Sequence, residues 1–163
     1  MEVELNVDTV ESRSDRLLEA AVEDAMRETE GATVEQVMSA DFLVVAPEDT
    51  LGEVAEKMRT RDVGSVLVTH YGRLIGILTS RDMLRALAGR VHSSEARARE
   101  WMTVEPITVS ANTTLEAAAL LMTEHHIHHL PVVEGERHVG MVGTRDVVRS
   151  ASSEFLGGIG LGF

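Results

Sequence analysis

The chain has 163 residues, of which 44% are hydrophobic, and its formal net charge is −12. This length and apolar content predict a globular chain with one compact core, or two half-domains that share a core. The absence of cysteine excludes disulfides, thiolate metal sites and cysteine nucleophiles. The chain lacks an apolar run of about 18 residues and a signal-peptide pattern, so we expect a cytoplasmic protein without membrane contact.

The negative charge is concentrated near the N-terminus, where residues 1–36 hold 11 acidic and 3 basic residues. Aromatic residues make up only 3% of the chain. The chain therefore lacks the basic surface and the stacking platforms typical of nucleic-acid-binding proteins, and we expect no nucleic-acid partner. Small anions such as nucleotides remain plausible ligands, because local arginines and helix N-termini bind them.

Residues 1–32 form an acidic N-terminal extension. Residues 2–13 are polar and charged, which predicts loose order. Residues 14–28 have the apolar spacing of an amphipathic helix, with Leu18, Val22 and Ala25 on one face. We expect this helix to pack on the rest of the chain or on a second subunit.

Residues 37–84 recur as residues 101–148 without a gap, offset by 64 residues, and 11 of the 48 paired positions are identical. Such a period indicates two copies of one supersecondary unit, each too small to bury its own core. We place repeat 1 at residues 33–90, a linker at 91–100 and repeat 2 at 101–150. A functional site is expected between the copies.

Each repeat is predicted to run strand, helix, strand, strand, helix, which makes the fold α/β. In repeat 1 these elements are residues 42–46, 51–61, 65–69, 73–78 and a helix from Ser80. In repeat 2 they are residues 107–109, 115–125, 130–133, 138–142 and a helix from Thr144. Residues 151–163 end in a Gly-rich apolar segment, which predicts a flexible or docking tail.

Each repeat closes with a strand that feeds directly into a helix, and this junction carries polar side chains. In repeat 1 the junction holds Thr79, Arg81 and Asp82. A hydroxyl, free backbone N–H groups and a carboxylate at a helix N-terminus suit a nucleotide, because the N–H groups and arginine hold phosphate and the carboxylate holds ribose. The same spacing is also that of a helix capping box, which needs no ligand.

The paired junctions, the capped helices, the segment from Ile127 to Val133 and the duplication together resemble the CBS domain, and the pair resembles a tandem CBS, or Bateman, module. The resemblance implies two β-α-β-β-α repeats packed through a pseudo-twofold axis. It also implies clefts for adenosine-containing ligands such as AMP, ADP, ATP, NAD or S-adenosylmethionine, and a homodimer. The predicted function is that of a non-catalytic regulatory module that signals to a protein partner by conformational change, with AMP or ATP as the favoured ligand.

The resemblance also implies residue roles. In the first cleft Asp82 would bind ribose, Thr79 would contact the phosphate or a ribose hydroxyl, and Arg81 would face the phosphate. The adenine would be bordered by Gly64, Ser65 and Val66. In the second cleft Asp146 would bind ribose and Arg145 and Thr144 would face the phosphate, with His129, Leu130 and Pro131 beside the base. Gly143 replaces the hydroxyl residue of that second junction. The first cleft is therefore the favoured site.

A histidine cluster offers an alternative, because four of the seven histidines lie within five residues: His125, His126, His128 and His129. A zinc or nickel site here would need three or four converging ligands, with His92, His138 or a second chain contributing. The favoured interpretation is that these side chains are solvated or face phosphate, so no metal is favoured. The alternative function is a metal-binding or purely structural interaction protein. The chain lacks the common hydrolase, P-loop and zincin motifs, so we expect no enzyme.

Overall fold

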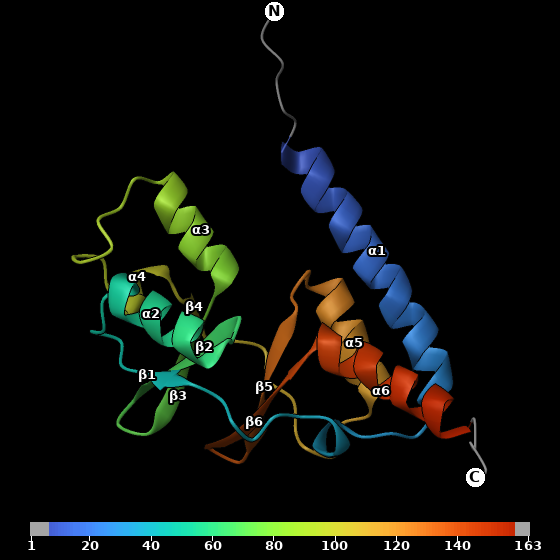
Figure 1. Cartoon of the computed structure of the whole chain (residues 1–163). Coiled ribbons are helices and arrows are strands. Elements are labelled where there is room, and N and C mark those ends of the chain that lie inside the picture. The colour runs from blue at the N-terminus through green and yellow to red at the C-terminus, as the bar shows by residue number, and fades with distance from the viewer. Residues whose placement is uncertain (1–6, 159–163) are drawn as a thin grey trace, which may run out of the picture.

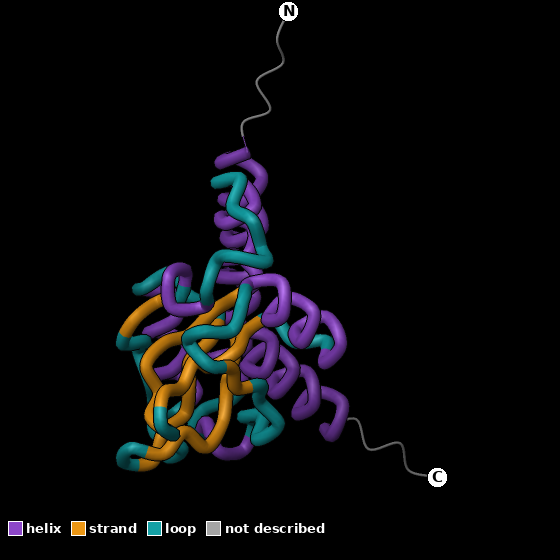
Figure 2. The backbone as a smooth tube through the Cα atoms, turned by 90° about the vertical axis from the view of Figure 1, so that its left-hand side faces the viewer, coloured by secondary structure: helices purple, strands orange, loops and turns teal. Residues whose placement is uncertain are grey.

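The structure is a computed structural model that describes residues 7–158. Its elements, in chain order, are α1 (Val7–Glu28), the 3₁₀ helix η1 (Val34–Gln36), β1 (Val44–Val45), α2 (Leu51–Arg61), β2 (Ser65–His70), β3 (Arg73–Thr79), α3 (Ser80–Ala88), α4 (Ala98–Trp101), β4 (Thr103–Val104), α5 (Leu115–Glu124), β5 (His129–Glu134), β6 (Arg137–Gly143) and α6 (Thr144–Gly158). The fold is mixed α/β, as predicted. In Figure 2 the strands of both repeats gather into one block, with helices beside and above it. Within residues 7–158, no helix is long and apolar enough to cross a bilayer.

The hairpins of the two repeats are built alike. In the first sheet the strand order is β1-β2-β3-β4, with β1 parallel to β2 and the other pairs antiparallel. The β5-β6 hairpin forms the second sheet. The register shifts between Val68 and Thr69 in one hairpin and between Val132 and Val133 in the other, so even the irregularity recurs at the 64-residue offset.

The repeats exchange chain segments. Thr103, near the start of repeat 2, pairs with Ile77 of repeat 1, and Ser39, near the start of repeat 1, pairs with Met141 of repeat 2. Each of these pairs becomes the other when 64 is added to or subtracted from its residue numbers. The first residues of each repeat therefore pair with the sheet of the other repeat, so neither repeat is complete alone.

The same exchange occurs at the first helix of each repeat. Leu51 N, at the start of α2, donates to Ala96 O from the predicted linker, at 2.9 Å, and Leu115 N, at the start of α5, donates to Ala32 O at 2.9 Å. Ala96 and Ala98 are buried. The predicted linker at residues 91–100 is therefore in part a packed segment, because Ala96 O accepts from the first residue of α2. This segment includes the first residues of α4.

Three apolar clusters form the core. One lies in repeat 1 and includes Val54 and Leu78, and a second lies in repeat 2 and includes Leu115. The third joins the repeats through Leu67, Ile77 and Met141, with Phe42 and Leu74 packed against it. This third cluster buries apolar surface that a single repeat would leave exposed to water.

Helix α1 extends the core of repeat 2. Its residues Val22 and Ala25 are 2% and 4% exposed and belong to the repeat 2 cluster. The helix lies along α6 and α5, and its N-terminal half projects beyond them (Figure 1). The predicted loose order of residues 2–13 is wrong for residues 7–13, because adding a residue to an existing helix is far easier than nucleating one. Residues 2–6 lie outside the described residues.

Two other predictions differ from the structure. Residues 107–109 form no strand, and only an isolated bridge joins Val109 to Val132. Helix α6 continues to Gly158, so the start of the expected tail at residues 151–163 is helical. Ala151 is 5% exposed in the cluster with α1, and this packing favours helix beyond the end of the repeat. Residues 159–163 lie outside the described residues.

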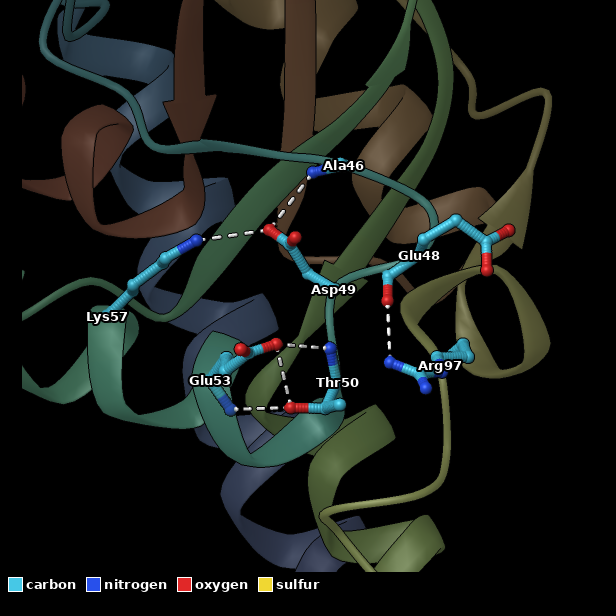
Figure 3. Close-up of polar contacts among 7 residues, drawn as sticks. All are labelled: Ala46, Glu48, Asp49, Thr50, Glu53, Lys57 and Arg97. Carbon is cyan, nitrogen blue, oxygen red and sulfur yellow. Dashed lines mark hydrogen bonds and ion pairs between the residues drawn. The ribbon is translucent and has the colours of Figure 1, made fainter.

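Polar contacts position the start of α2 (Figure 3). Thr50 is its N-cap: Glu53 N donates to Thr50 Oγ1 at 3.2 Å, and Thr50 N donates to Glu53 Oε2 at 2.8 Å. Asp49 Oδ2 accepts from Ala46 N and from Lys57 Nζ. Arg97 donates to Glu48 O at 3.0 Å, which ties the chain between the repeats to this helix end.

The two repeats allow a matched test of this capping. Thr114 caps α5 by accepting from Ala117 N at 3.2 Å, but Ala117 cannot return a side-chain bond as Glu53 does. We expect Thr50→Ala to lower the free energy of unfolding by about 1 to 2 kcal/mol and Thr114→Ala by about half as much. Urea unfolding of both variants measures the difference, and equal losses would contradict it.

Candidate functional site

A cleft of about 350 Å³ opens between the repeats beside the N-terminus of α3. Repeat 1 contributes residues 79–82 and Arg85, the chain entering repeat 2 contributes Thr103, Pro106 and Ile107, and residues 126–129 form the wall from repeat 2. The cleft is thus lined by both repeats. A ligand here would touch both at once.

Asp82 is the buried acid of the cleft, with a side chain only 9% exposed. Its Oδ2 accepts from Thr79 N at 2.8 Å and from Thr79 Oγ1 at 3.0 Å, and its Oδ1 accepts from Arg85 at 2.6 Å. The capping-box alternative is therefore present in the structure. A carboxylate has about four acceptor sites, so roughly one remains for a hydroxyl donor in the cleft.

Arginine and histidine side chains dominate the polar lining of the cleft. Arg81 and Arg85 lie on the α3 side, and His126, His128 and His129 on the repeat 2 side. Arg81 lies 3.3 Å from His128 Nε2, a contact that crosses from one repeat to the other. Because a guanidinium only donates, His128 Nε2 is the acceptor in this contact. The cleft therefore offers fixed positive charge to an anionic group.

The junction of repeat 2 keeps only part of this arrangement. Asp146 Oδ2 accepts from Gly143 N at 2.7 Å, and Asp146 Oδ1 accepts from Arg149 at 2.5 Å. The Asp–Arg pair of repeat 1 thus recurs, but the threonine hydroxyl has no counterpart. The second junction retains the helix cap and has one polar group fewer.

The loss of that hydroxyl has a steric reason. His129 pairs with Gly143 in the β5-β6 ladder, at the place where Ser65 pairs with Thr79 in repeat 1. A Cβ atom on Gly143 would lie 3.1 Å from His128 O, which is a tight contact with backbone, whereas its distance to His129 Cδ2 would be an ordinary 3.6 Å. The backbone oxygen of His128 therefore crowds a side chain at position 143.

His129 lies at the boundary between the repeats. Its Nε2 is 3.6 Å from the position of a Cβ atom on Gly64 of repeat 1. Burial, followed by the nearby His128, lowers the pKa of His129 from 6.5 to about 4, although Asp146 acts in the opposite direction. His129 is therefore neutral at pH 7 and contributes hydrogen-bonding capacity, not charge, to the cleft.

The structure brings some of the predicted site residues together. Thr79, Arg81 and Asp82 share the cleft with His129, which had been assigned to the other cleft. The other predicted residues do not line this cleft: Gly64, Ser65, Val66, Thr144, Arg145, Asp146, Leu130 and Pro131. Val66 and Leu130 are fully buried in the cores of their repeats, and Ser65 and Thr144 are nearly so.

The sequence prediction missed several lining residues, among them Arg85, Thr103 and Pro106. A signal for Arg85 exists, because Arg149 follows it by 64 residues and the pattern Asp-x-x-Arg therefore occurs in both repeats. For Thr103 and Pro106 no such signal exists. They reach the cleft only because the chain between the repeats crosses to the sheet of repeat 1.

The histidine cluster does not converge. His126, with a left-handed φ of 52°, places Nδ1 3.9 Å from Glu19 Oε1 of α1, whereas His128 faces Arg81 and His129 faces Gly64. No three or more histidine, aspartate or glutamate side chains are grouped to hold a metal ion anywhere in the described part of the chain. A metal on this cluster would need ligands from elsewhere.

Comparison with protein-family models matches the CBS domain twice, at residues 34–89 and 98–153. The chain therefore belongs to the CBS-domain family, and the resemblance seen in its sequence is confirmed. It is 32% identical over 127 residues to the CBS domain-containing protein YhcV of Bacillus subtilis, covering 77% of this chain and 91% of YhcV. It is 34% identical over 156 residues to the mitochondrial CBS domain-containing protein CBSX3 of Arabidopsis thaliana, covering 88% and 75%.

Solved structures share the fold. The CBS domain pair of protein MJ0100, in complex with 5-methylthioadenosine and S-adenosyl-L-methionine, is 25% identical with a TM-score of 0.70, covering 76% of this chain and 98% of that one. Hypoxic Response Protein I, with two coordinated zinc ions, is 31% identical with a TM-score of 0.64, covering 72% and 98%. The chain is thus a CBS pair, and such pairs include one that binds adenosine ligands.

Proposed function

We propose that this protein is a non-catalytic regulator that binds an anionic adenosine nucleotide, AMP or ATP, in the Asp82 cleft and signals to a protein partner by a change of conformation. The observation that carries the proposal is the cleft itself, which both repeats line and in which Asp82 lies with Arg81 and Arg85. The adenosine ligands of the MJ0100 pair support the choice of ligand class.

The charges of the cleft favour a phosphate over a cationic ligand. Arg81 and Arg85 stand beside one carboxylate, Asp82, which is already paired with Arg85 at 2.6 Å. Phosphate oxygens accept charge-assisted hydrogen bonds from guanidinium groups, whereas a sulfonium would meet like charge. AMP or ATP should therefore bind better here than S-adenosylmethionine.

Signalling follows from the position of the ligand between the repeats. A ligand shifts a conformational equilibrium only by the difference between its affinities for the two states. A phosphate bound to Arg81 would compete with its contact to His128, which now joins the two repeats. Ligand binding would then alter how repeat 2 sits on repeat 1.

A thermal-shift measurement tests the proposed ligand. At a concentration 100 times its dissociation constant, AMP or ATP is expected to stabilise the folded chain by about 2.7 kcal/mol, a rise in Tm of about 5 to 10 °C. The Asp82→Asn variant should lose most of this rise, because an amide can still accept from Thr79 N but accepts a hydrogen bond from a ribose hydroxyl more weakly than a carboxylate does. S-adenosylmethionine should give a smaller shift.

The second junction provides the matched control. Asp146→Asn makes the same change 64 residues later and should leave the AMP or ATP shift intact. If AMP, ADP, ATP, NAD and S-adenosylmethionine all fail to raise the Tm of the wild-type chain, the proposed function is wrong. Equal losses in Asp82→Asn and Asp146→Asn would move the site away from the Asp82 cleft.

The zinc of Hypoxic Response Protein I is the reason to keep metal binding as the second candidate. The described residues of one chain supply no three-ligand group, so zinc should not change the Tm of the wild-type chain. A zinc-dependent rise that His126→Ala and His128→Ala remove would favour the metal-binding alternative. A cytoplasmic location and a homodimer remain predictions.

A further inference from the structure

Residues 126–128 form a wall that two cavities share. They line the Asp82 cleft, and they also line a cavity of about 20 Å³ between α1 and repeat 2. The lining of this small cavity includes Leu18, Glu19 and Val22 of α1. The proposed ligand site and the packing of α1 therefore depend on the same three residues.

The contacts of this wall reach both of its neighbours. His128 Nε2 accepts from Arg81 of α3 at 3.3 Å, whereas His126 Nδ1 lies 3.9 Å from Glu19 Oε1 of α1. Ile127, between the two histidines, packs against the core cluster of repeat 2, to which α1 also contributes. Three consecutive residues thus connect α3 of repeat 1 with α1.

The backbone of the wall is held by the helices on either side of it. Ile127 N donates to Met122 O of α5 at 3.0 Å, and Thr144 N of α6 donates to His128 O at 3.1 Å. A hydrogen-bonded and closely packed segment transmits a displacement to its neighbours. A shift of His128 is therefore passed on to Ile127 and His126.

Repeat 1 follows the same backbone path without the histidines and without α1. Subtracting 64 from the three residue numbers gives residues 62–64, and Asp62 has nearly the same left-handed φ as His126, 51° against 52°. Gly64 stands in place of His128 and so has no side chain. Of the described residues, none from α1 belongs to the core cluster of repeat 1. The connection between cleft and helix is therefore specific to repeat 2.

We propose that α1 is the output element of the Asp82 cleft: a nucleotide phosphate that binds Arg81 loosens the packing of α1 on repeat 2 through residues 126–128. The inference rests on the proposed function and adds the part of the molecule that responds to the ligand. A loosened α1 exposes Val22 and Ala25, which are now buried, and so offers an apolar face to a protein partner.

The direction of the effect follows from competition for one arginine and for space. A phosphate that accepts hydrogen bonds from Arg81 releases His128 from its contact with that guanidinium. The ligand also occupies the cleft that residues 126–128 border, and the cavity next to α1 leaves these residues room to shift towards the helix. The ligand and the packed form of α1 therefore oppose each other.

Thiol labelling measures the packing of α1, because the chain has no cysteine of its own. Val22→Cys places one thiol between α1 and repeat 2, where the valine is 2% exposed, and Val54→Cys makes the same change in the core of repeat 1, where the valine is 0% exposed. With AMP or ATP, the labelling rate of Val22→Cys should rise about fivefold or more, whereas that of Val54→Cys should stay equal or fall. If the nucleotides raise the Tm but do not raise the labelling rate of Val22→Cys, the proposal is overturned and the proposed function stands.

A second measurement needs no nucleotide. Arg81→Met removes the guanidinium that contacts His128, and it should speed the labelling of Val22→Cys about threefold. Arg85→Met is the matched control, because it removes the arginine of the same helix that pairs with Asp82, and it should leave that rate unchanged. Equal labelling rates in the two backgrounds would overturn the coupling. Should AMP and ATP both fail to raise the Tm, the proposed function is wrong, and this measurement alone decides whether the cleft and α1 are coupled.

Discussion

Gly76→Ala is expected to lower the free energy of unfolding by about 2 kcal/mol or more, although the change adds one methyl group. A Cβ atom on Gly76 would overlap Met102 Sδ, lie 2.9 Å from Met102 Cγ and lie 3.0 Å from the backbone oxygen of Thr103. The methionine end can move, but Thr103 is held in the β3-β4 ladder. The substitution would push the crossing segment off the sheet of repeat 1.

The duplication provides an equivalent position and a partial rescue for this prediction. A Cβ atom on Gly140 would lie 2.7 Å from Met38 Sδ and 3.1 Å from Ser39 O, so Gly140→Ala should destabilise the chain for the same reason, but less. Adding Met102→Ala to Gly76→Ala should recover part of the loss, and a double-mutant cycle in urea measures this coupling. Strictly additive effects would show that Met102 does not hold Gly76 in this way.

Acid should destabilise the fold through His129. Its pKa is about 4 in the folded chain and 6.5 as the ordinary value, so between these limits the unfolded chain binds a proton that the folded chain does not. The contribution of neutral His129 to the free energy of unfolding is therefore fully present above about pH 6.5, and it is lost as the pH drops towards 4. Between pH 7 and pH 5 the expected loss from this one group is about 2 kcal/mol.

The comparison is made between variants, because other groups also titrate in this range. His129→Gln keeps a side chain of similar reach that does not titrate, and its unfolding free energy should fall less between pH 7 and pH 5 than that of the wild-type chain. His125→Gln removes an exposed histidine from the same segment and should keep the wild-type fall. A His129→Gln profile parallel to the wild-type profile would refute the assignment.

Much of the repeat architecture was predictable because it depends on local rules. Helix α2 begins and ends where predicted, at Leu51 and Arg61, since Thr50 and Glu53 form a capping box next to an apolar stripe. Both hairpins agree within one residue at each end, because alternation and turn residues act over short distances. The first residues of α1 were missed because they extend a helix that has already formed, and the end of α6 was missed because its packing against α1 is not encoded in the local sequence.

The candidate site was only half predictable for a different reason. The junction residues Thr79, Arg81 and Asp82 are a local motif and were identified as such, and they do line the cleft. The opposite wall was assigned within the same repeat, at residues 64–66, whereas the cleft is closed by residues 126–129 and by the chain entering repeat 2. Residues 79–82 of repeat 1 meet residues 126–129 of repeat 2 through contacts between parts of the chain that are far apart in sequence. Local sequence patterns therefore do not predict which segment lies opposite the junction.

The sequence by itself determined that this protein is a duplicated α/β unit of the CBS type, because a gap-free 64-residue repeat with matched caps and turns leaves few other folds. Only the tertiary structure decided which segments meet across the repeats, which junction opens into a cleft and which repeat α1 covers. These outcomes depend on where Thr103 and Ser39 cross between the sheets and on which helices α1 covers. Hydrophobic periodicity and helix capping act between residues a few positions apart, so they can be read from the sequence. The exchange of segments between the sheets and the packing of α1 on other helices follow from burying apolar surface between distant parts of the chain.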